Sequence, residues 1–140
     1  VWGYGLTRQA PVELWSPPVW TRHIAALLML VSFVLLAASY VPGTRIKAAV
    51  HHPMVLGTKV WAFAHLVSNG RLADMVLFGA FLVWSIVLYA ASRRRDRRLG
   101  TRYIAGPASR DVIAIVVGAA LYGAFAFWLH GLLIGVMPFG

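Results

Sequence analysis

The sequence predicts an all-α protein, a polytopic bundle of four transmembrane helices, from three observations. Sixty per cent of the 140 residues are hydrophobic, only 12% are charged, and the mean hydropathy is +0.73. A soluble domain typically carries a charge on about 25% of its residues, roughly twice this fraction. Four long apolar runs account for the excess, and an apolar run of about 20 residues can cross a bilayer as a helix.

The four spans are expected at about residues 22–41, 53–69, 72–92 and 112–137. The first span lies between Pro17-Pro18 and Pro42-Gly43 and has the usual length of a membrane helix. Pro53 suits the first turn of the second span, because the N–H that proline lacks would have no helical partner there. The second span is short and ends at the polar pair Asn69-Gly70. Short connections predict up-and-down packing of neighbouring helices.

Basic residues give the spans an orientation. The run RRRDRR (93–98) follows the third span directly, in a connection of about twenty residues. Lys and Arg concentrate on the cytoplasmic side of membrane proteins, so we expect this connection and the one with Arg45 and Lys47 to be cytoplasmic. This placement explains the net charge of +9 without nucleic-acid binding. Residues 1–140 form one membrane domain, and VWGYG resembles the end of a helix, so we expect one or two N-terminal helices of a longer protein to precede it.

Composition excludes several kinds of chemistry. There is no cysteine, which excludes iron–sulfur clusters, disulfides, thiol nucleophiles and covalent c-type haem attachment. The four carboxylates lie outside the middle of the spans, and neither a Walker A loop nor a GxGxxG motif occurs. If the protein is an enzyme, which the sequence leaves open, a cofactor is expected to supply the chemistry.

The stretch HHPMVLGTKVWAFAH (51–65) places ionisable groups in an apolar segment. In a helix, His52 and His65 are separated by about 20 Å along the axis and roughly 140° around it, so they cannot share one metal. His65 lies in the outer half of its span, and His130 lies in the outer half of the last span. Such groups usually face the bundle interior, where they mark a site or form hydrogen bonds between helices. Two neutral imidazoles in a bundle can also be the axial ligands of haem b, so His65 and His130 are candidate iron ligands.

Other side chains near these histidines have open interpretations. Trp61 shares the helix face of His65 and is a candidate cofactor contact. Lys59 can pair with a haem propionate, or its chain can extend to the cytoplasmic interface. Asp74 complements the helix dipole at the start of the third span and can pair with Arg71. His51 lies at the cytoplasmic mouth of the second span and has no evident partner.

The residues HPMVLGTKVWAFAHLVSNG (52–70), followed by an apolar span and DRR (96–98), resemble the NnrU family of bacterial membrane proteins. The upstream VWGYG, APVELWSPP and LAASYVPG do so as well, and the likeness covers roughly residues 1–98 and is looser beyond them. The family is related to plant zeta-carotene isomerase, a haem b protein with the same HP-x11-AH spacing. The resemblance implies that His65 is an axial haem ligand and His52 the histidine of the HP motif. The resemblance also implies that the family's other proposed ligand belongs to a first helix, which we expect to precede this sequence.

NnrU proteins are associated with denitrification. The resemblance therefore implies a multi-pass, haem b-binding protein of the bacterial cytoplasmic (inner) membrane that supports nitrite and nitric oxide reduction. Its expected partners are the lipid bilayer and components of nitrite or nitric oxide reductases. One alternative is a haem-dependent isomerase or redox enzyme acting on an apolar polyene. Another is a non-enzymatic accessory or assembly subunit whose histidines form hydrogen bonds between helices.

Overall fold

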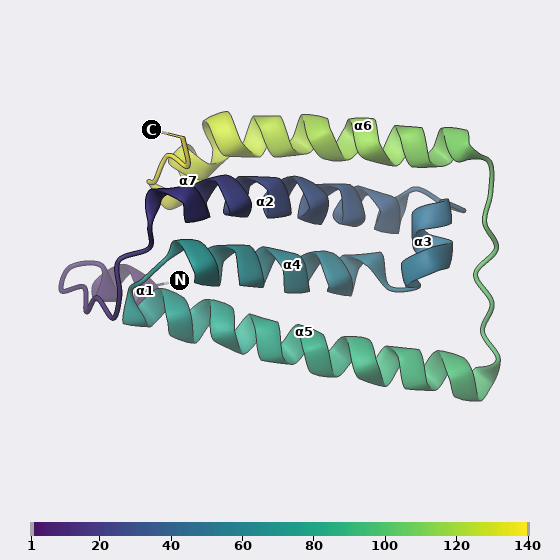
Figure 1. The fold of residues 1–140 in the computed structure, drawn as a ribbon, viewed down its shortest axis with the longest axis horizontal. Helices are drawn as coiled ribbons and strands as arrows, with labels where there is room; N and C mark the ends of the chain where they lie inside the picture. Colours follow the sequence, from purple (N-terminus) through teal and green to yellow (C-terminus); the bar gives the residue numbers. More distant parts are fainter. Residues whose placement is uncertain (1, 140) are drawn as a thin grey trace.

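Four long helices lie side by side in one row (Figure 1). The computed structural model describes residues 2–139. The long helices are α2 (Val19–Tyr40), α4 (Pro53–Ser68), α5 (Leu72–Leu99) and α6 (Ala108–Ala124). Their order across the row is α6, α2, α4 and α5, because α6 returns along the far side of α2 instead of packing on α5. Helix α2 therefore has neighbours on both sides.

The short elements cover the two ends of the row. Helix α3 (Arg45–Val50) lies at one end, and α1 (Trp2–Thr7) and α7 (His130–Ile134) lie at the other (Figure 1). The connection between α5 and α6 also passes the α3 end, where the Arg45 side chain donates to the Gly106 carbonyl at 3.2 Å. Both basic segments therefore lie at the same end, in agreement with the charge pattern.

The all-α prediction is confirmed, but the count of four membrane spans is not. Within residues 2–139, three helices are long and apolar enough to cross a membrane: Val19–Tyr40, Leu72–Leu99 and Ala108–Ile134. Helix α4 has 16 residues and is about 24 Å long, short of the roughly 30 Å hydrocarbon layer. The chain turns sharply before Pro53 and leaves the helix at Asn69, which limits the length of α4.

Large apolar side chains cover the outer faces of the row. Val83 and Val87 on α5, and Val112 and Val116 on α6, are each more than half exposed. Soluble monomers rarely expose apolar surface on this scale. These faces are compatible with a lipid bilayer.

Small residues bring α2 close to both of its neighbours. A Cβ atom on Gly118 of α6 would lie 2.6 Å from the Cα of Val34 on α2. On the other side, a Cβ on Gly57 of α4 would lie 3.1 Å from the carbonyl oxygen of Ser32, whose hydroxyl donates to the Gly57 carbonyl at 2.8 Å. Small residues at contacts, supplemented by hydroxyl hydrogen bonds, are how membrane helices commonly associate.

The last two helices differ from their predicted bounds. Helix α5 continues through the basic run 93–98 and ends at Gly100, whose φ of +65° terminates the helix. The connection to α6 is therefore residues 100–107, shorter than the twenty residues expected. The final helical segment runs from Ala108 to Ile134 instead of 112–137, and a π-helical turn, η1 (Phe125–Leu129), interrupts it.

Candidate functional site

A cavity of about 380 Å³ opens at the α1 and α7 end of the row. Its lining comes from α2, the end of α4, the end of the last helical segment and residues 136–139. The lining includes both candidate ligand histidines, two aromatic rings and two polar side chains: His65, His130, Phe33, Tyr122, Arg22 and Asn69. The volume lies within the roughly 300–1,000 Å³ of ligand pockets.

Helix α2 contributes small side chains to the middle of this cavity. Ala25 and Ala26 line it, and α2 lies between α4, which carries His65, and α6, whose continuation carries His130. The two histidines therefore approach the cavity from opposite sides of α2, whose contribution to the lining also includes Met29 and Phe33.

The ring of His65 is fixed by its own helix and by aromatic neighbours. Its Nδ1 lies 2.9 Å from the carbonyl oxygen of Trp61, one turn earlier in α4. A carbonyl oxygen only accepts hydrogen bonds, so Nδ1 carries the hydrogen, and Nε2 of the neutral ring keeps its lone pair. The ring centroid lies 4.5 Å from that of Phe78 on α5 and 5.2 Å from that of Trp61.

His130 has the same hydrogen-bond arrangement. Its Nδ1 lies 2.6 Å from the carbonyl oxygen of Val136, which therefore accepts a hydrogen from Nδ1 and leaves the Nε2 lone pair available. Gly135, with φ +76°, turns the chain so that Val136 returns toward the histidine. In an uninterrupted α-helix, His130 would be rotated about 80° from Tyr122. The wider π-helical turn between them accommodates both residues in the cavity lining.

One lining residue carries a permanent charge. Arg22, in the first turn of α2, is exposed and contributes a guanidinium to the lining. Asn69 also lines the cavity, and its side-chain amide donates to the His65 carbonyl at 2.8 Å. The cavity thus combines two imidazoles with a single cation that can bind an anionic group.

The structure places the other predicted site residues outside this lining. Trp61 contacts the ring of His65 but is not among the lining residues, and neither is Lys59. His52 lies at the opposite end of α4, where its Nε2 is 2.7 Å from Oδ2 of Asp96. The sequence suggested Lys59 as a cation that could pair with a haem propionate, and it missed Arg22. The position of Arg22 near Trp20, at the start of the first span, could have indicated that it lies beside the candidate cofactor site.

The candidate donor set has two members. Among residues 2–139, no group of three or more His, Asp or Glu side chains is arranged to hold a metal ion. Two imidazoles with free Nε2 atoms and no third protein ligand suit an iron whose remaining ligands come from a porphyrin. The residues of the cavity therefore fit a haem better than a bare metal ion.

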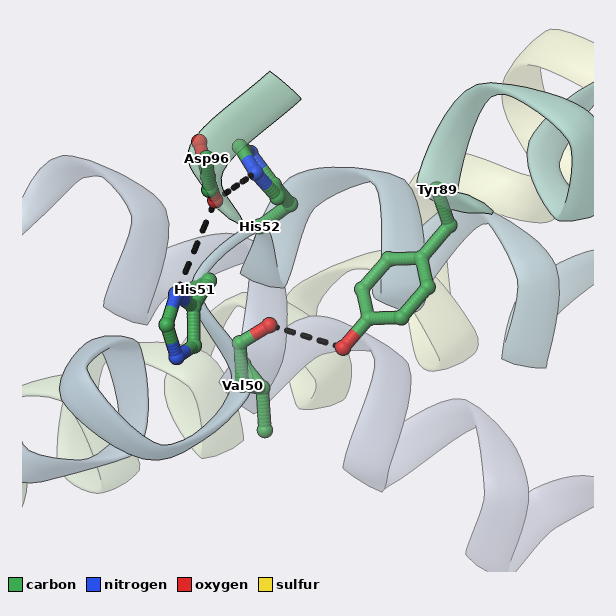
Figure 2. A network of polar contacts seen from close by, with 5 residues as sticks. All are labelled: Val50, His51, His52, Tyr89 and Asp96. Carbon is green, nitrogen blue, oxygen red and sulfur yellow. Dashed lines mark hydrogen bonds and ion pairs between the residues drawn. The ribbon is translucent and has the colours of Figure 1, made fainter. Parts of the chain in front are cut away.

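A second polar cluster lies at the α3 end of the row, around the α3–α4 turn (Figure 2). His51 and His52 both point toward Asp96 of α5, and the Tyr89 hydroxyl donates to the carbonyl of Val50 at 2.8 Å. The sequence left His51 without a partner. The local signals for Asp96 are that it is the one acidic residue among five arginines and that it begins the DRR motif (96–98).

Asp74 at the start of α5 also has a partner that differs from the one expected. The Tyr4 hydroxyl donates a hydrogen bond to its Oδ1 and ties α1 to α5. Burial, and then the hydrogen bond and charge of Asp74, raise the pKa of Tyr4 to about 12. The ion pair with Arg71 suggested by sequence is replaced by this phenol–carboxylate contact, while the Arg71 backbone forms a β-bridge with Glu13.

Comparison with known proteins identifies the family of this chain. No curated protein and no solved structure matches it. A family model described as NnrU protein matches residues 1–138, nearly the whole sequence, including the last helix, where the motifs of the resemblance are looser. The chain belongs to the NnrU family.

Proposed function

We propose that this NnrU-family protein binds haem b in the cavity at the α1 and α7 end, with His65 and His130 as axial ligands. We also propose that it supports nitrite or nitric oxide reduction from the bacterial cytoplasmic membrane, by electron transfer or haem handling. The observation that carries the haem proposal is that both imidazoles line one cavity and both have Nδ1 engaged by a backbone carbonyl.

The tautomers support this proposal. An imidazole binds iron through a nitrogen lone pair, and in metalloproteins its other nitrogen usually donates to a carbonyl or carboxylate. The two cavity histidines lie on helices on either side of α2. If they served as hydrogen-bonding groups between helices, their ring nitrogens would be expected to contact another helix. Both satisfy their Nδ1 atoms locally, on residues four and six positions away along the chain.

The remaining lining suits the shape and charge of a haem. The alanines of α2 leave room for a flat ring, and Phe33, Tyr122 and Phe125 supply apolar contact. The Arg22 guanidinium can pair with a propionate carboxylate, an interaction for which arginine is well suited. In this arrangement His65 and His130 would hold the iron, α2 would contact the ring, and Arg22 would neutralise part of its charge.

The functional assignment rests on the family as well as on the cavity. A bound haem b would supply one-electron chemistry, which the side chains of this chain lack. NnrU proteins are associated with nitrite and nitric oxide reduction, and a membrane haem protein could serve those reactions by passing electrons or by delivering haem. Three helices are long and apolar enough to cross a membrane, which supports a membrane location for such a protein.

Absorption spectroscopy of the detergent-purified protein tests the haem proposal. After reconstitution with haem, the wild-type protein is expected to bind one equivalent and to show a six-coordinate, low-spin spectrum when oxidised and when reduced. His65→Ala and His130→Ala are each expected to lose that spectrum. His23→Ala is the matched control, because His23 is exposed near the start of α2 and does not line the cavity.

Two further results bear on the alternatives. If neither His65→Ala nor His130→Ala changes the spectrum, or if wild-type protein takes up no haem, the haem proposal is wrong and the histidines act in helix packing. The denitrification role is tested separately, by anaerobic nitrite consumption in cells whose own copy is replaced by His65→Ala. Unchanged nitrite consumption at equal protein level would contradict that role without affecting the haem assignment.

A further inference from the structure

Two imidazoles converge on one carboxylate oxygen at the α3 end of the row, opposite the haem cavity (Figure 2). The Nε2 atom of His52 is 2.7 Å from Oδ2 of Asp96, and the Nδ1 atom of His51 is 3.6 Å from the same oxygen. The Asp96 side chain is only 6% exposed, and those of His52 and His51 are 15% and 22% exposed. The carboxylate is therefore largely shielded from water and faces two titratable rings.

An unusual backbone turn makes this convergence possible. His51 has φ 65° and ψ −49°, and the N–H of His52 donates to the carbonyl of Val50 at 2.8 Å, which defines a γ-turn centred on His51. A γ-turn with positive φ is rare and strained. In a helix or strand, adjacent side chains diverge. Here the turn directs both histidines toward Asp96.

Helix α5 holds this turn at two points. Tyr89 and Asp96 are seven residues apart and so lie on the same face of α5. The Tyr89 hydroxyl donates to the Val50 carbonyl, and Asp96 faces the two histidines. From the connection to α6, the Tyr103 ring lies 4.7 Å from the His51 ring, centroid to centroid. The cluster thus joins three separate segments of the chain.

One nitrogen in the cluster lacks a hydrogen-bond partner. Within the described residues, His51 Nδ1 is buried and forms no hydrogen bond, because 3.6 Å exceeds hydrogen-bond distance. If Nδ1 of a neutral His51 ring carried a lone pair, that lone pair would face the carboxylate. If it carried a hydrogen, the N–H would be too far from the carboxylate oxygen to form a hydrogen bond. A proton added to the ring places an N–H⁺ opposite the carboxylate, where a small approach completes a charge-assisted hydrogen bond.

We propose that His51, His52 and Asp96 form a proton-binding site in which the two imidazoles share one proton beside a single carboxylate oxygen. The site lies at the end of the row that the basic residues assign to the cytoplasm. The shared proton joins the strained α3–α4 turn to the C-terminal part of α5. Its loss leaves the Asp96 charge without a cationic ring beside it.

The surrounding charges limit the site to one proton. Arg93 of α5 acts on the Asp96 carboxylate and, together with Arg95, on the Tyr103 phenol, so two guanidinium groups bring positive charge close to the cluster. The carboxylate favours the first proton, and the nearby cations disfavour a second.

Two tyrosine rings lie beside the histidines of the cluster. Burial and the Asp96 carboxylate raise the pKa of Tyr103, so its phenol stays neutral, although Arg95 and Arg93 act in the opposite direction. The Tyr89 hydroxyl is engaged with the Val50 carbonyl.

The proposal is tested by NMR of ¹⁵N-histidine-labelled full chain in detergent, because imidazole ¹⁵N shifts distinguish neutral from protonated rings. In the wild type, the His51–His52 pair is expected to take up its two protons in two clearly separated steps. In Asp96→Asn, the proton affinity of the pair is expected to fall at least tenfold. Asp111→Asn is the matched control, because Asp111 lies at the same end and accepts from the backbone N–H of Ile46, away from the histidines.

Single histidine variants test whether the proton is shared. In His51→Gln, His52 is expected to hold the proton, and in His52→Gln, His51 is expected to hold it. Circular dichroism compares the folding of each variant with that of wild type. If Asp96→Asn fails to fold, Asp96→Glu serves in its place, because it keeps the carboxylate and is expected to retain the proton. Independent uptake of two protons by the pair, or a titration unchanged in Asp96→Asn, would overturn the proposal. The proposal would also be overturned if only His52 binds the proton, so that His51 stays neutral in the His52→Gln variant.

Discussion

Gly118 is the position where a single added methyl group most directly tests the packing of the row. It lies where α6 crosses α2, and its substitution by alanine would place a Cβ 2.6 Å from the Cα and 2.9 Å from the N of Val34. All of these neighbours are backbone atoms, so no side-chain rotation relieves the overlap. Carbon atoms in contact are normally about 3.5–4.0 Å apart, so α6 must move away from α2 by about 1 Å.

The size of the effect follows from a comparison with Gly123, near the C-terminal end of α6. A Cβ on Gly123 would meet no atom within 4 Å. Both Gly→Ala changes gain helix propensity of about 1 kcal/mol, which cancels when the two variants are compared. Forcing extra volume into a packed contact costs about 1–3 kcal/mol. Gly118→Ala is therefore expected to be about 1–3 kcal/mol less stable than Gly123→Ala.

Unfolding in detergent, followed by circular dichroism against increasing SDS, measures this difference. Gly118→Ala is expected to unfold at lower SDS than wild type or near it, and Gly123→Ala at higher SDS. Because α6 leads to His130, Gly118→Ala is also expected to weaken haem binding, whereas Gly123→Ala is not. Equal unfolding free energies for the two variants would refute the close α2–α6 contact.

Two further predictions concern the end of the row that carries the cavity. The folded-state pKa of Tyr4 is about 12 against an ordinary value of 10.0, so the Tyr4–Asp74 contact is fully retained below pH 10 and is lost as pH rises through about 12. Release of α1, followed by tryptophan fluorescence, should show this alkaline transition, and the same transition in Tyr4→Phe would contradict the assignment. Arg22→Gln is expected to raise the dissociation constant for haem roughly two- to fivefold, the equivalent of about 0.5–1 kcal/mol for an exposed ion pair. The difference in dissociation constant between wild type and Arg22→Gln should vanish for haem with esterified propionates. Arg71 does not line the cavity, so an equal effect of Arg71→Gln would refute a specific role for Arg22.

Apolar patterning predicted most of the fold because each long helix carries its own signal. The four helices and the common end of the basic segments were predicted, and the resemblance to the NnrU family is confirmed. The count of four spans was not confirmed. The second apolar run begins and ends close to where the sequence predicted, but its 16-residue helix is shorter than the roughly 20 residues that cross a bilayer.

Contacts between helices were harder to predict than the helices themselves. Sequence reasoning placed His65 and His130 in the same half of the bilayer, and the structure brings both to one cavity. That meeting depends on α6 packing against α2, and on the π-helical turn before His130, neither of which local patterns specify. The His52–Asp96 contact joins positions 44 residues apart, so the sequence placed Asp96 in a basic run and in the DRR motif but gave it no partner.

Electron paramagnetic resonance of the oxidised, haem-loaded protein tests the central claim most directly, because it reports the number of strong axial ligands on the iron. Wild type and His52→Ala are expected to give the same low-spin signal, since His52 lies at the far end of α4 from the cavity. His65→Ala and His130→Ala are each expected to convert it to a high-spin signal. A low-spin signal that persists in either of these two variants would contradict axial ligation by His65 and His130.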